Sequence, residues 1–361
     1  MTEKEYLTAL NTFTMFGPAR TKLLLSYFKS AKKIWDLKLS ELTEVGVKQE
    51  TAEKFIKHRD SFNIQDYLSK LEKLSIKVVT IFDDDYPENL KGLSDAPFVL
   101  YIRGNFKNTD SNAVAIVGSR MMTSYGREVA KKFAGELASF GVTIVSGLAL
   151  GVDAEAQRAA LSVGGRTISA LASGLDIISP YTNKKLALEF ISKDGGAVVS
   201  ENPLGYEPHP YDFPVRDRLI SGLSKAVIVV EGRMKSGTFY TVKAAADQGR
   251  TVFAVPGPIT SPTSEAPNYL IQNGSKLATS TKDILDELHL QFKVDKEAVK
   301  KVMPGDVYEE KILKILMTEP LHLDELVRIS GGATSEVSAR LTIMEMKGMV
   351  RNLGQGVFKK A

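Results

Sequence analysis

The chain has 361 residues, enough for two or three domains, and its 43% hydrophobic and 25% charged residues are typical of a globular protein. We expect no signal peptide, no membrane partner and a cytoplasmic location, because no apolar run approaches the roughly 20 residues of a membrane span and there is no cysteine for disulfide or thiolate chemistry. The net charge of +4 is small, so binding to a polyanion would depend on local clusters of basic residues.

Residues 1–75 are predicted to be helical, because apolar residues recur at helical spacing around glycine breaks at 17–20 and 44–56. Such breaks are typical of sterile-alpha-motif (SAM)-like and helix-hairpin-helix modules, whose turns can present backbone N–H groups to a phosphate. A plain helical bundle is the favoured alternative to direct DNA contact. Residues 76–110 begin with a strand-like run and are then rich in turn formers, so we expect a connector that packs on the next domain.

Residues 111–290 alternate continuous apolar runs with helical segments. Such runs are typical of parallel strands buried on both faces, so we predict an α/β fold with a Rossmann-like, doubly wound parallel sheet. The predicted strands are 113–117, 142–146, 166–171, 196–200, 226–231 and 251–255, and the predicted helices include 124–140, 151–163, 183–193 and 237–248. Most of the motifs join a strand to a glycine turn or a helix start, an arrangement that favours a phosphate-binding rim.

Residues 291–305 are charged and end in Met-Pro-Gly, so they are predicted to form a linker. Residues 306–361 are predicted to form three amphipathic helices and a hairpin, which is the order of a winged-helix domain. The predicted recognition helix, 334–347, carries basic and acidic residues together (Arg340, Lys347, Glu336 and Glu345). This balance is poor for the DNA major groove, so we favour a protein contact or a weak DNA contact there.

Several signatures of catalysis and cofactor binding are absent from the sequence. It has no Walker loop, no Gly-x-Gly-x-x-Gly after a strand and no Gly-x-Ser-x-Gly elbow. Its four histidines lack zinc-site spacing and are expected to be surface or packing residues. We therefore expect a protein that is not an enzyme, with no cofactor, no metal site and no catalytic residues.

Two predicted strands end in small and basic residues. Gly118 lets the backbone approach a ligand closely, and the planar guanidinium of Arg120 suits a phosphate. A second strand ends in a similar way, and we predict that this whole group binds DNA: Gly118, Ser119, Arg120, Ser146 and Gly147. A structural ion pair of Arg120 is the alternative.

Asn183, Lys184 and Lys185 open a predicted helix. Lysines near a helix N-terminus oppose the helix dipole, which is tolerable where an anion lies between them. We predict that all three contact DNA, with solvated lysines as the alternative.

Phe213, Arg216 and Arg218 place two arginines beside an aromatic ring. This pattern favours phosphate contact by the arginines and stacking of a base on the ring, which is worth about 1–3 kcal/mol per base. Alternatively, the ring belongs to the core and one arginine pairs internally, for instance with Glu201 or Glu231.

Lys235, Ser236, Gly237 and Thr238 form a further loop that enters a helix, and their amides, hydroxyls and charge suit one phosphate. Lys243 lies further along that helix and faces either the same groove or solvent, and we include it in the predicted DNA-binding set. A mononucleotide would not need this many cationic loops, so the set points to a strand of nucleic acid.

At these residues the chain resembles the DNA-processing protein A (DprA/Smf) family. The resemblance rests on the ordered motifs AIVGSR, SGLALGVDAEAQ, SENPLG, FPVRDRLISGLSKAVIVVEG, KSGTF, DQGR and VFAVPG, within about residues 77 to 280. It implies a non-catalytic protein that binds single-stranded DNA, protects incoming strands during natural transformation and loads the RecA recombinase onto them. The family's DNA-binding positions fall at 118–120, at the lysines after Asn183 and within 213–218.

The resemblance also implies a homodimer formed through the last part of the Rossmann-like domain. Leu270, Ile271 and Leu277 are the candidate interface residues, and ordinary core packing is the alternative.

The chain departs from the family pattern at several positions: Leu150 stands where Arg is frequent, Gln157 where His is common, Asp217 where Asn is usual, and Ser179-Pro180 where Tyr-Pro is usual. The change at Leu150 puts one expected charge in doubt, for which Lys184 or Lys185 could compensate. The alternative function is a nucleotide-cleaving phosphoribohydrolase with a similar sheet, but Thr241 stands where those enzymes have a catalytic Glu.

Overall fold

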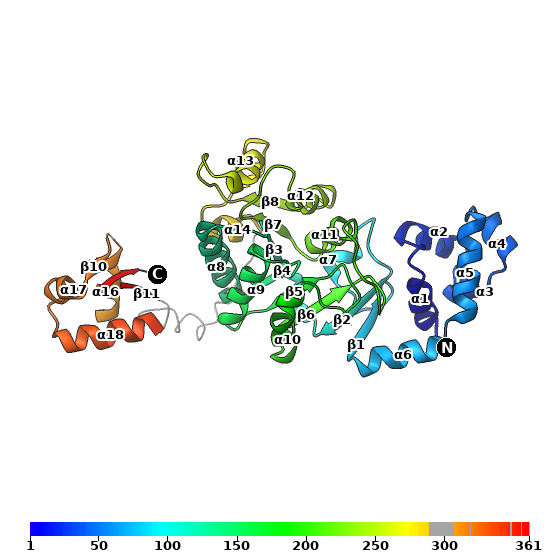
Figure 1. Ribbon diagram of the computed structural model, residues 1–361, viewed down its shortest axis with the longest axis horizontal. Coiled ribbons are helices and arrows are strands. Elements are labelled where there is room, and N and C mark those ends of the chain that lie inside the picture. The colour runs from blue at the N-terminus through cyan, green and yellow to red at the C-terminus, as the bar shows by residue number, and fades with distance from the viewer. Residues whose placement is uncertain (289–306, 318, 347–348, 355, 361) are drawn as a thin grey trace. The chain divides into compact units, whose positions relative to one another are not determined.

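The computed structural model describes residues 1–288, 307–317, 319–346, 349–354 and 356–360. The chain divides into two compact units, Met1–Phe292 and Lys293–Ala361 (Figure 1). The linker predicted at 291–305 lies outside the described residues. Within the described ranges, no helix is both long and apolar enough to cross a membrane.

The first unit begins with helices, as predicted for residues 1–75: α1 (Glu3–Thr12), α2 (Pro18–Phe28), α3 (Ala31–Asp36), α4 (Leu39–Glu44), α5 (Gln49–Ser61) and α6 (Ile64–Lys73). Helix α1 starts at a capping box in which the Thr2 hydroxyl accepts from the Glu5 N–H and the Glu5 carboxylate accepts from the Thr2 N–H. Phe13, Phe16 and Phe55 pack ring against ring, with centroids 4.9–5.4 Å apart. These aromatic contacts hold the helices together as a small bundle.

A nine-stranded sheet follows, in the order β1-β2-β6-β5-β4-β3-β7-β8-β9. Its strands are β1 (Ile76–Thr80), β2 (Val99–Gly104), β3 (Ala113–Val117), β4 (Thr143–Ser146), β5 (Thr167–Ala170), β6 (Gly196–Ser200), β7 (Ala226–Val229), β8 (Thr251–Ala254) and β9 (Lys276–Leu277). Strands β3 to β9 pair in parallel, whereas β1 and β2 pair antiparallel to their neighbours. The predicted α/β fold is confirmed, and the segment expected to be a connector adds two strands to the sheet.

Helices separate these strands: α7 (Glu88–Lys91), α8 (Ser124–Ser139), α9 (Val152–Ser162), α10 (Lys184–Ser192), α11 (Asp212–Gly222), α12 (Thr238–Asp247), α13 (Glu265–Gln272) and α14 (Thr281–Glu287), with 3-10 turns at Asn108–Ser111, Tyr181–Asn183 and Pro262–Ser264. The predicted strands 113–117 to 251–255 and the four predicted helices agree with the structure to within two residues at each end. Helix α11 was not predicted, because its sequence mixes charged and apolar residues without a clear apolar stripe.

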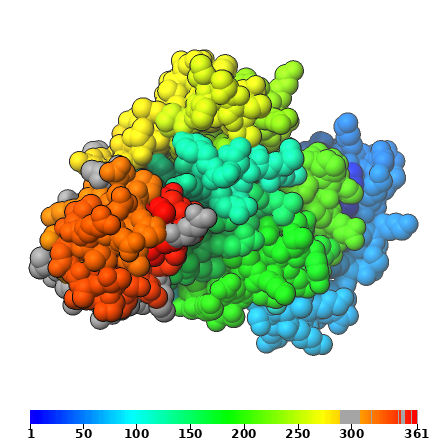
Figure 2. All heavy atoms as spheres, turned by 60° about the vertical axis from the view of Figure 1, so that its left-hand side comes forward, coloured from blue at the N-terminus to red at the C-terminus, as the bar shows by residue number. Residues whose placement is uncertain are grey.

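The parallel strands are buried on both faces, which explains their continuous apolar sequences. Val114 and Ile116 of β3 pack with α8 and α9, on the face seen in Figure 2, while Ala115 and Val117 pack with α11 and α12. The side chains alternate between the faces as the period of a strand requires.

The strand order reverses between β3 and β7, and this reversal positions the site. From β3 the chain builds outward through β4, β5 and β6, and then crosses back through α11 to place β7 on the other side of β3. Beyond the carboxyl edge, the chain after β3 enters α8 on one face of the sheet and the chain after β7 enters α12 on the other face. This leaves a crevice, the usual ligand position in open α/β sheets.

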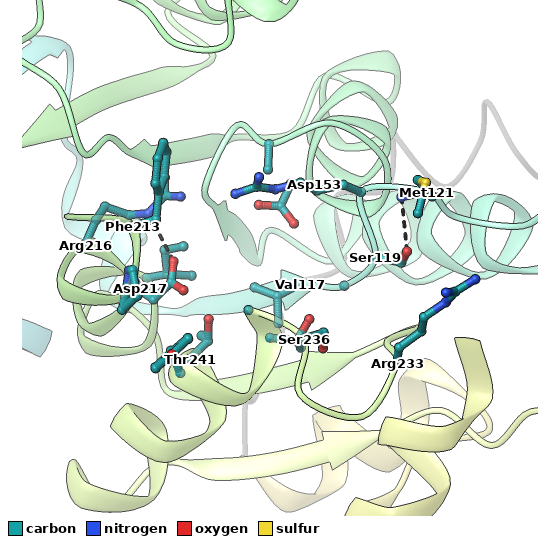
Figure 3. Close-up of a pocket in the computed structure, with 18 of the residues that line it drawn as sticks. Val117, Ser119, Met121, Asp153, Phe213, Arg216, Asp217, Arg233, Ser236 and Thr241 are labelled. Atoms are coloured by element: carbon teal, nitrogen blue, oxygen red, sulfur yellow. Dashed lines mark hydrogen bonds and ion pairs between the residues drawn. The ribbon is translucent and has the colours of Figure 1, made fainter. Parts of the chain in front are cut away.

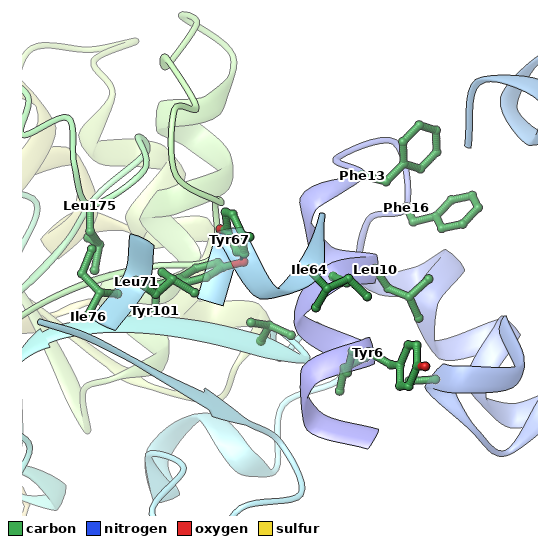
Figure 4. Close-up of a cluster of buried hydrophobic side chains, with 14 of the residues drawn as sticks. Tyr6, Leu10, Phe13, Phe16, Ile64, Tyr67, Leu71, Ile76, Tyr101 and Leu175 are labelled. Carbon is green, nitrogen blue, oxygen red and sulfur yellow. Dashed lines mark hydrogen bonds between the residues drawn. The ribbon is translucent and has the colours of Figure 1, made fainter. Parts of the chain in front are cut away.

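The helical bundle is joined to the sheet by a buried tyrosine pair (Figure 4). The Tyr67 hydroxyl on α6 donates to the Tyr101 hydroxyl on β2 at 3.2 Å and accepts from the Leu204 N–H at 3.1 Å. The Asn11 side chain on α1 donates to the Glu201 carbonyl at 2.9 Å. These polar contacts lie within one apolar cluster that the bundle and the sheet share.

The second unit contains α16 (Val307–Leu316), α17 (Leu323–Ser330), α18 (Thr334–Met346) and a three-stranded sheet in the order β10-β12-β11, formed by Leu321–His322, Val357–Lys360 and Val350–Gly354. This confirms the predicted winged-helix order. On the predicted recognition helix, Arg340 pairs with Glu336 at 3.2 Å and lies over the ring of Tyr308. Lys347 lies outside the described residues.

We predict that Tyr67→Phe lowers the free energy of unfolding by about 1–3 kcal/mol, because the Leu204 N–H and the Tyr101 hydroxyl lose a partner inside the protein. Chemical denaturation would measure the change. Tyr27→Phe is the matched control, because Tyr27 is 69% exposed, and it should leave stability unchanged. Equal stability of the two variants would show that the tyrosine pair does not fasten the bundle.

Candidate nucleic-acid interface

A cleft of about 590 Å³ lies at the carboxyl ends of β3 and β7, where the strand order reverses. The loops after β3, β4 and β7 and the start of α11 line it. Figure 3 shows two sides to this cleft, one with Phe213, Arg216, Asp217 and Thr241 and the other with Ser119, Met121 and Arg233. The structure thus brings together residues from four of the sequence motifs.

The loop after β3 is held by its backbone and leaves one cation exposed. The Ser119 N–H donates to the Glu231 carbonyl at 2.8 Å, and the Ser119 hydroxyl accepts from the Met121 N–H at 3.1 Å. Arg120 is exposed, forms no ion pair with a described residue, and lies 5.4 Å from the centroid of the Phe213 ring. Its guanidinium is available to an anion.

Arg216 has a different environment, because only 6% of it is exposed. Its guanidinium donates to the carbonyls of Gly147 at 2.7 Å and Ala170 at 2.5 Å, and Nε donates to Asp217 at 3.1 Å. A side chain at position 147 would collide with it, since a Cβ there would lie 2.9 Å from the guanidinium carbon. Arg216 therefore supports the loop after β4 from inside the protein. This geometry does not favour the phosphate contact predicted for it.

Arg218 is also committed inside the chain. It donates to the Asp95 carbonyl at 2.7 Å and forms an ion pair with the half-buried Glu201. The sequence analysis had named a pair with Glu201 as the alternative to DNA contact. Phe213 is half-buried, and its ring is near the guanidinium groups of both Arg120 and Arg216. Stacking of a base on Phe213 stays a prediction, and it would require Arg120 to move aside or share the ring.

The residues predicted after β4 and before α10 are also either buried and hydrogen-bonded or exposed. Ser146 is buried and donates to the Ile116 carbonyl, and Asn183 is buried and donates to the Leu148 carbonyl at 2.8 Å. Lys184 and Lys185 are exposed. Asn183 thus fastens the loop after β4 to the start of α10, and the two lysines follow it at the surface.

Two further residues near these lysines were not singled out from the sequence. Tyr181 is 80% exposed and its ring lies 5.5 Å from the Lys184 ammonium. Arg158 is largely exposed and donates to the Asn183 side chain at 3.3 Å. The aromatic residue beside the lysines could have been noticed in the sequence, whereas Arg158 comes close only through folding.

The loop before α12 supplies free hydroxyls and charges. Lys235, Gly237 and Lys243 are exposed, as is Arg233, which the sequence analysis did not single out. The Ser236 hydroxyl is buried, and neither it nor the Thr238 hydroxyl has a hydrogen-bond partner among the described residues. Helix α12 starts at Thr238, but the amides of Phe239 and Tyr240 already donate to the carbonyls of Ser236 and Gly237 at 3.2 and 3.0 Å. The amides of Gly237 and Thr238 are left without a backbone partner among the described residues. Arg233, Ser236, Gly237 and Thr238 line the cleft.

Glu231 fills the position where a Rossmann-type fold usually binds a phosphate. Its carboxylate is buried at the N-terminus of α8, where it accepts from the Thr123 N–H at 2.8 Å and the Thr123 hydroxyl at 2.5 Å. A Cβ on Gly126 would lie 2.1 Å from this carboxylate, so a larger residue there would displace the Glu231 side chain from Thr123. The positive end of the α8 dipole is thereby satisfied within the protein.

Comparison with known proteins identifies the family. Residues 77–289 match the family model of DNA recombination-mediator protein A, and residues 301–356 match that of the DprA winged helix domain. The chain belongs to the DNA recombination-mediator protein A family. Protein Smf of Escherichia coli is 40% identical over 68% of this chain, and the match spans 66% of that relative's length, just under two thirds.

Two solved structures of the family resemble the chain. The X-ray structure of DprA from Streptococcus pneumoniae has a TM-score of 0.65 and 33% identity, and the match covers 80% of this chain and 98% of that one. DprA from Helicobacter pylori has a TM-score of 0.54 and 30% identity over 60% and 96% of the two chains, and its structure concerns a single-stranded DNA binding mode. Fold and family are thus established together.

Two departures from the family pattern lie in different environments, one exposed and one buried. Leu150 is 46% exposed beside the cleft loops, so an expected surface charge is missing there. Gln157 is buried, and its side chain donates to the hydroxyls of Thr167 at 3.1 Å and Ser169 at 2.6 Å. The Gln157 amide is therefore held inside the core by its NH2 group, whereas its Oε1 has no hydrogen-bond partner among the described residues.

Asp153 and Asp217 place two carboxylates below the exposed cations. Burial raises the pKa of Asp217 to about 6, an effect that the charges of Arg216 and Arg120 partly offset. Burial also raises the pKa of Asp153, whose carboxylate accepts from the Gly147 N–H at 3.0 Å. Arg216 lies between these two acids, so its positive charge is neutralised within the protein.

The three residues predicted for the dimer interface differ in how far they are exposed. Leu270 is buried in the core of its own chain beside β8, Ile271 is half-buried, and Leu277 is 49% exposed. The packing of Leu270 agrees with the alternative named in the sequence analysis. The homodimer itself stays a prediction.

We predict that Arg216→Ala lowers the free energy of unfolding by about 3–5 kcal/mol, because it leaves buried carboxylates without their cation. Arg120→Ala should leave stability unchanged, because Arg120 is exposed and unpaired among the described residues. Urea unfolding of both variants would measure the difference. A stable Arg216→Ala protein that no longer binds DNA would instead assign this arginine to direct contact.

Proposed function

We propose that the chain binds single-stranded DNA along the carboxyl edge of its sheet and acts as a recombination mediator. The observation that carries the proposal is a set of exposed cations on adjoining loops, none of which forms an ion pair with a described residue: Arg120, Lys184, Lys185, Arg233 and Lys235. A positive charge that the fold requires would form an ion pair inside the protein, as the charges of Arg216 and Arg218 do.

Hydrogen bonds link these loops into one continuous surface. Ser119 donates to the Glu231 carbonyl, which joins the loops after β3 and β7, and the Val152 N–H donates to the Ser119 carbonyl at 3.2 Å, which joins the loops after β3 and β4. Asn183 then ties the loop after β4 to the start of α10. Because neighbouring strands lie about 4.8 Å apart, the edge from β7 to β5 is about 15 Å long, enough for several phosphates.

A strand of nucleic acid suits this surface better than a free nucleotide does. Each phosphate of a strand needs its own cationic partner, whereas a mononucleotide would use one loop. The likeness to the Helicobacter pylori protein, whose title concerns single-stranded DNA binding, supports the same choice.

The further parts of the proposal rest on the family. They are protection of incoming strands during natural transformation, loading of the RecA recombinase, a homodimer that includes the segment of Leu270, Ile271 and Leu277, and a cytoplasmic location. A phosphoribohydrolase is disfavoured, because Thr241 offers no carboxylate and Glu231 is engaged at the N-terminus of α8. Release of free base from nucleoside monophosphates would revive that alternative.

We predict that Arg120→Ala weakens binding to a thymidine 20-mer about tenfold and makes the slope of log affinity against log salt shallower by about 0.7, the value for one lost phosphate contact on a single strand. Arg233→Ala should act in the same way. Fluorescence anisotropy over a salt series would test both variants against a matching duplex.

Lys193→Ala is the matched control for this series. Lys193 is exposed but precedes β6, so it lies at the amino edge of the parallel strands, away from the cleft. It should keep the affinity and salt slope of the unaltered chain. If the unaltered chain fails to bind the thymidine strand even at low salt, single-stranded DNA is not its ligand.

Affinity for the thymidine strand should rise severalfold as the pH falls from 7.5 to 5.5. Asp217 gains a proton through its raised pKa of about 6, so the cleft loses a negative charge while Arg120 and Arg216 stay positive. Asp217→Asn should flatten this rise. His209→Gln is the control, because His209 precedes the cleft residue Pro210, and this variant should keep the rise.

A further inference from the structure

Behind the exposed cations, the cleft contains polar groups that have no partner. Asp217 uses one carboxylate oxygen for Arg216, and its other oxygen accepts no hydrogen bond from a described residue. Thr241 is only 2% exposed and lines the cleft, yet its hydroxyl has no partner in the described part of the chain. The Ser236 hydroxyl is buried and unpartnered as well. Only the Ser236 hydroxyl is fully buried without a partner, which is costly unless a ligand satisfies it. The free Asp217 oxygen and the Thr241 hydroxyl are not fully buried, and both residues line the cleft, so these groups are available to a ligand.

These groups do not suit a phosphate. The Asp217 carboxylate would repel a phosphate at close range. A carboxylate flanked by hydroxyls is instead complementary to the edge of a base that offers two adjacent N–H donors and a carbonyl acceptor. Guanine has this pattern on its Watson–Crick edge.

We propose that the cleft binds one base of the bound strand and prefers guanine. The N1–H and N2–H groups of guanine would donate to the Asp217 carboxylate, on the side of the oxygen that Arg216 does not use, and O6 would accept from the hydroxyl of Thr241 or Ser236. This inference rests on the proposed binding of single-stranded DNA. Thymine would turn two carbonyl oxygens toward the carboxylate, and cytosine offers only one N–H donor group. Guanine is therefore the base that the polar groups satisfy best.

The dimensions of the cleft agree with one nucleotide. Its volume of about 590 Å³ is within the range of small-molecule sites. Thr238 lies at the start of α12 and Thr241 three residues further on, a rise of about 4.5 Å along the helix axis. A phosphate at the α12 N-terminus, near Arg233, would thus leave room for its base to reach Asp217, with Phe213 on the same side of the cleft as a stacking surface (Figure 3).

Competition binding to the full chain tests the proposal without any substitution. The competitors are thymidine 20-mers that carry, at every fifth position, guanine, adenine or hypoxanthine, beside the plain thymidine strand. We expect the guanine strand to bind about tenfold more tightly than the plain strand, the discrimination of one good bidentate contact. Hypoxanthine lacks the N2 amine and should lose most of that gain.

Variants then assign the preference to its residues. Asp217→Asn should reduce the ratio between the guanine and thymidine affinities to about one, and Thr241→Val, which removes the hydroxyl and leaves Arg216 untouched, should reduce it severalfold. Because the readout is a ratio within each variant, any general loss of folded protein cancels. Asp247→Asn, an exposed acid at the end of α12, is the matched control and should keep the full ratio.

The outcomes separate this inference from the proposed function. Equal binding of all four strands would overturn the guanine preference and leave single-stranded DNA binding intact. A guanine preference that survives Asp217→Asn would overturn the assignment to this carboxylate. Failure of every strand to bind would overturn the proposed function, and the inference with it.

Discussion

The buried Arg216 guanidinium is the interaction on which the edge of the sheet depends. It satisfies the carbonyls of Gly147 and Ala170, at the ends of β4 and β5, and lies between the carboxylates of Asp153 and Asp217. Buried charges are stable only when they are paired and hydrogen-bonded, so this network fixes one position for α11 and for the loops above it. The exposed cations of the cleft can point to solvent because Arg216 has already fixed the backbone beneath them.

The basic residues at this edge of the sheet therefore fall into two groups with different roles. Arg216 and Arg218 join the layers of the protein, whereas Arg120, Arg233 and the lysines at 184 and 185 are left for a ligand. A fixed backbone with exposed cations suits the strand that we propose, because backbone phosphates are the same for every base. The unpaired groups deeper in the cleft are the part that could distinguish one base from another.

Most of the sheet could be predicted from the sequence, since apolar runs such as Ala113–Val117 have no other stable place than a parallel strand covered on both sides. The role of an arginine could not. Arg120 and Arg216 both adjoin short motifs with small or aromatic residues, and only the fold brings the carbonyls of Gly147 and Ala170 to Arg216. The same holds for β2, whose neighbours in the sheet lie about 100 residues later or 25 earlier in the chain.

The position of Glu231 affects which ligands the protein can bind in a living cell. Cells contain free nucleotides at high concentration, and a Rossmann-like sheet with an open helix N-terminus would attract their phosphates. Here the protein's own carboxylate already occupies the start of α8 and is held there by Thr123 and Thr263. A nucleotide phosphate therefore cannot bind at the start of α8. The loops at the carboxyl edge stay free for the DNA strand that we propose, even when free nucleotides are abundant.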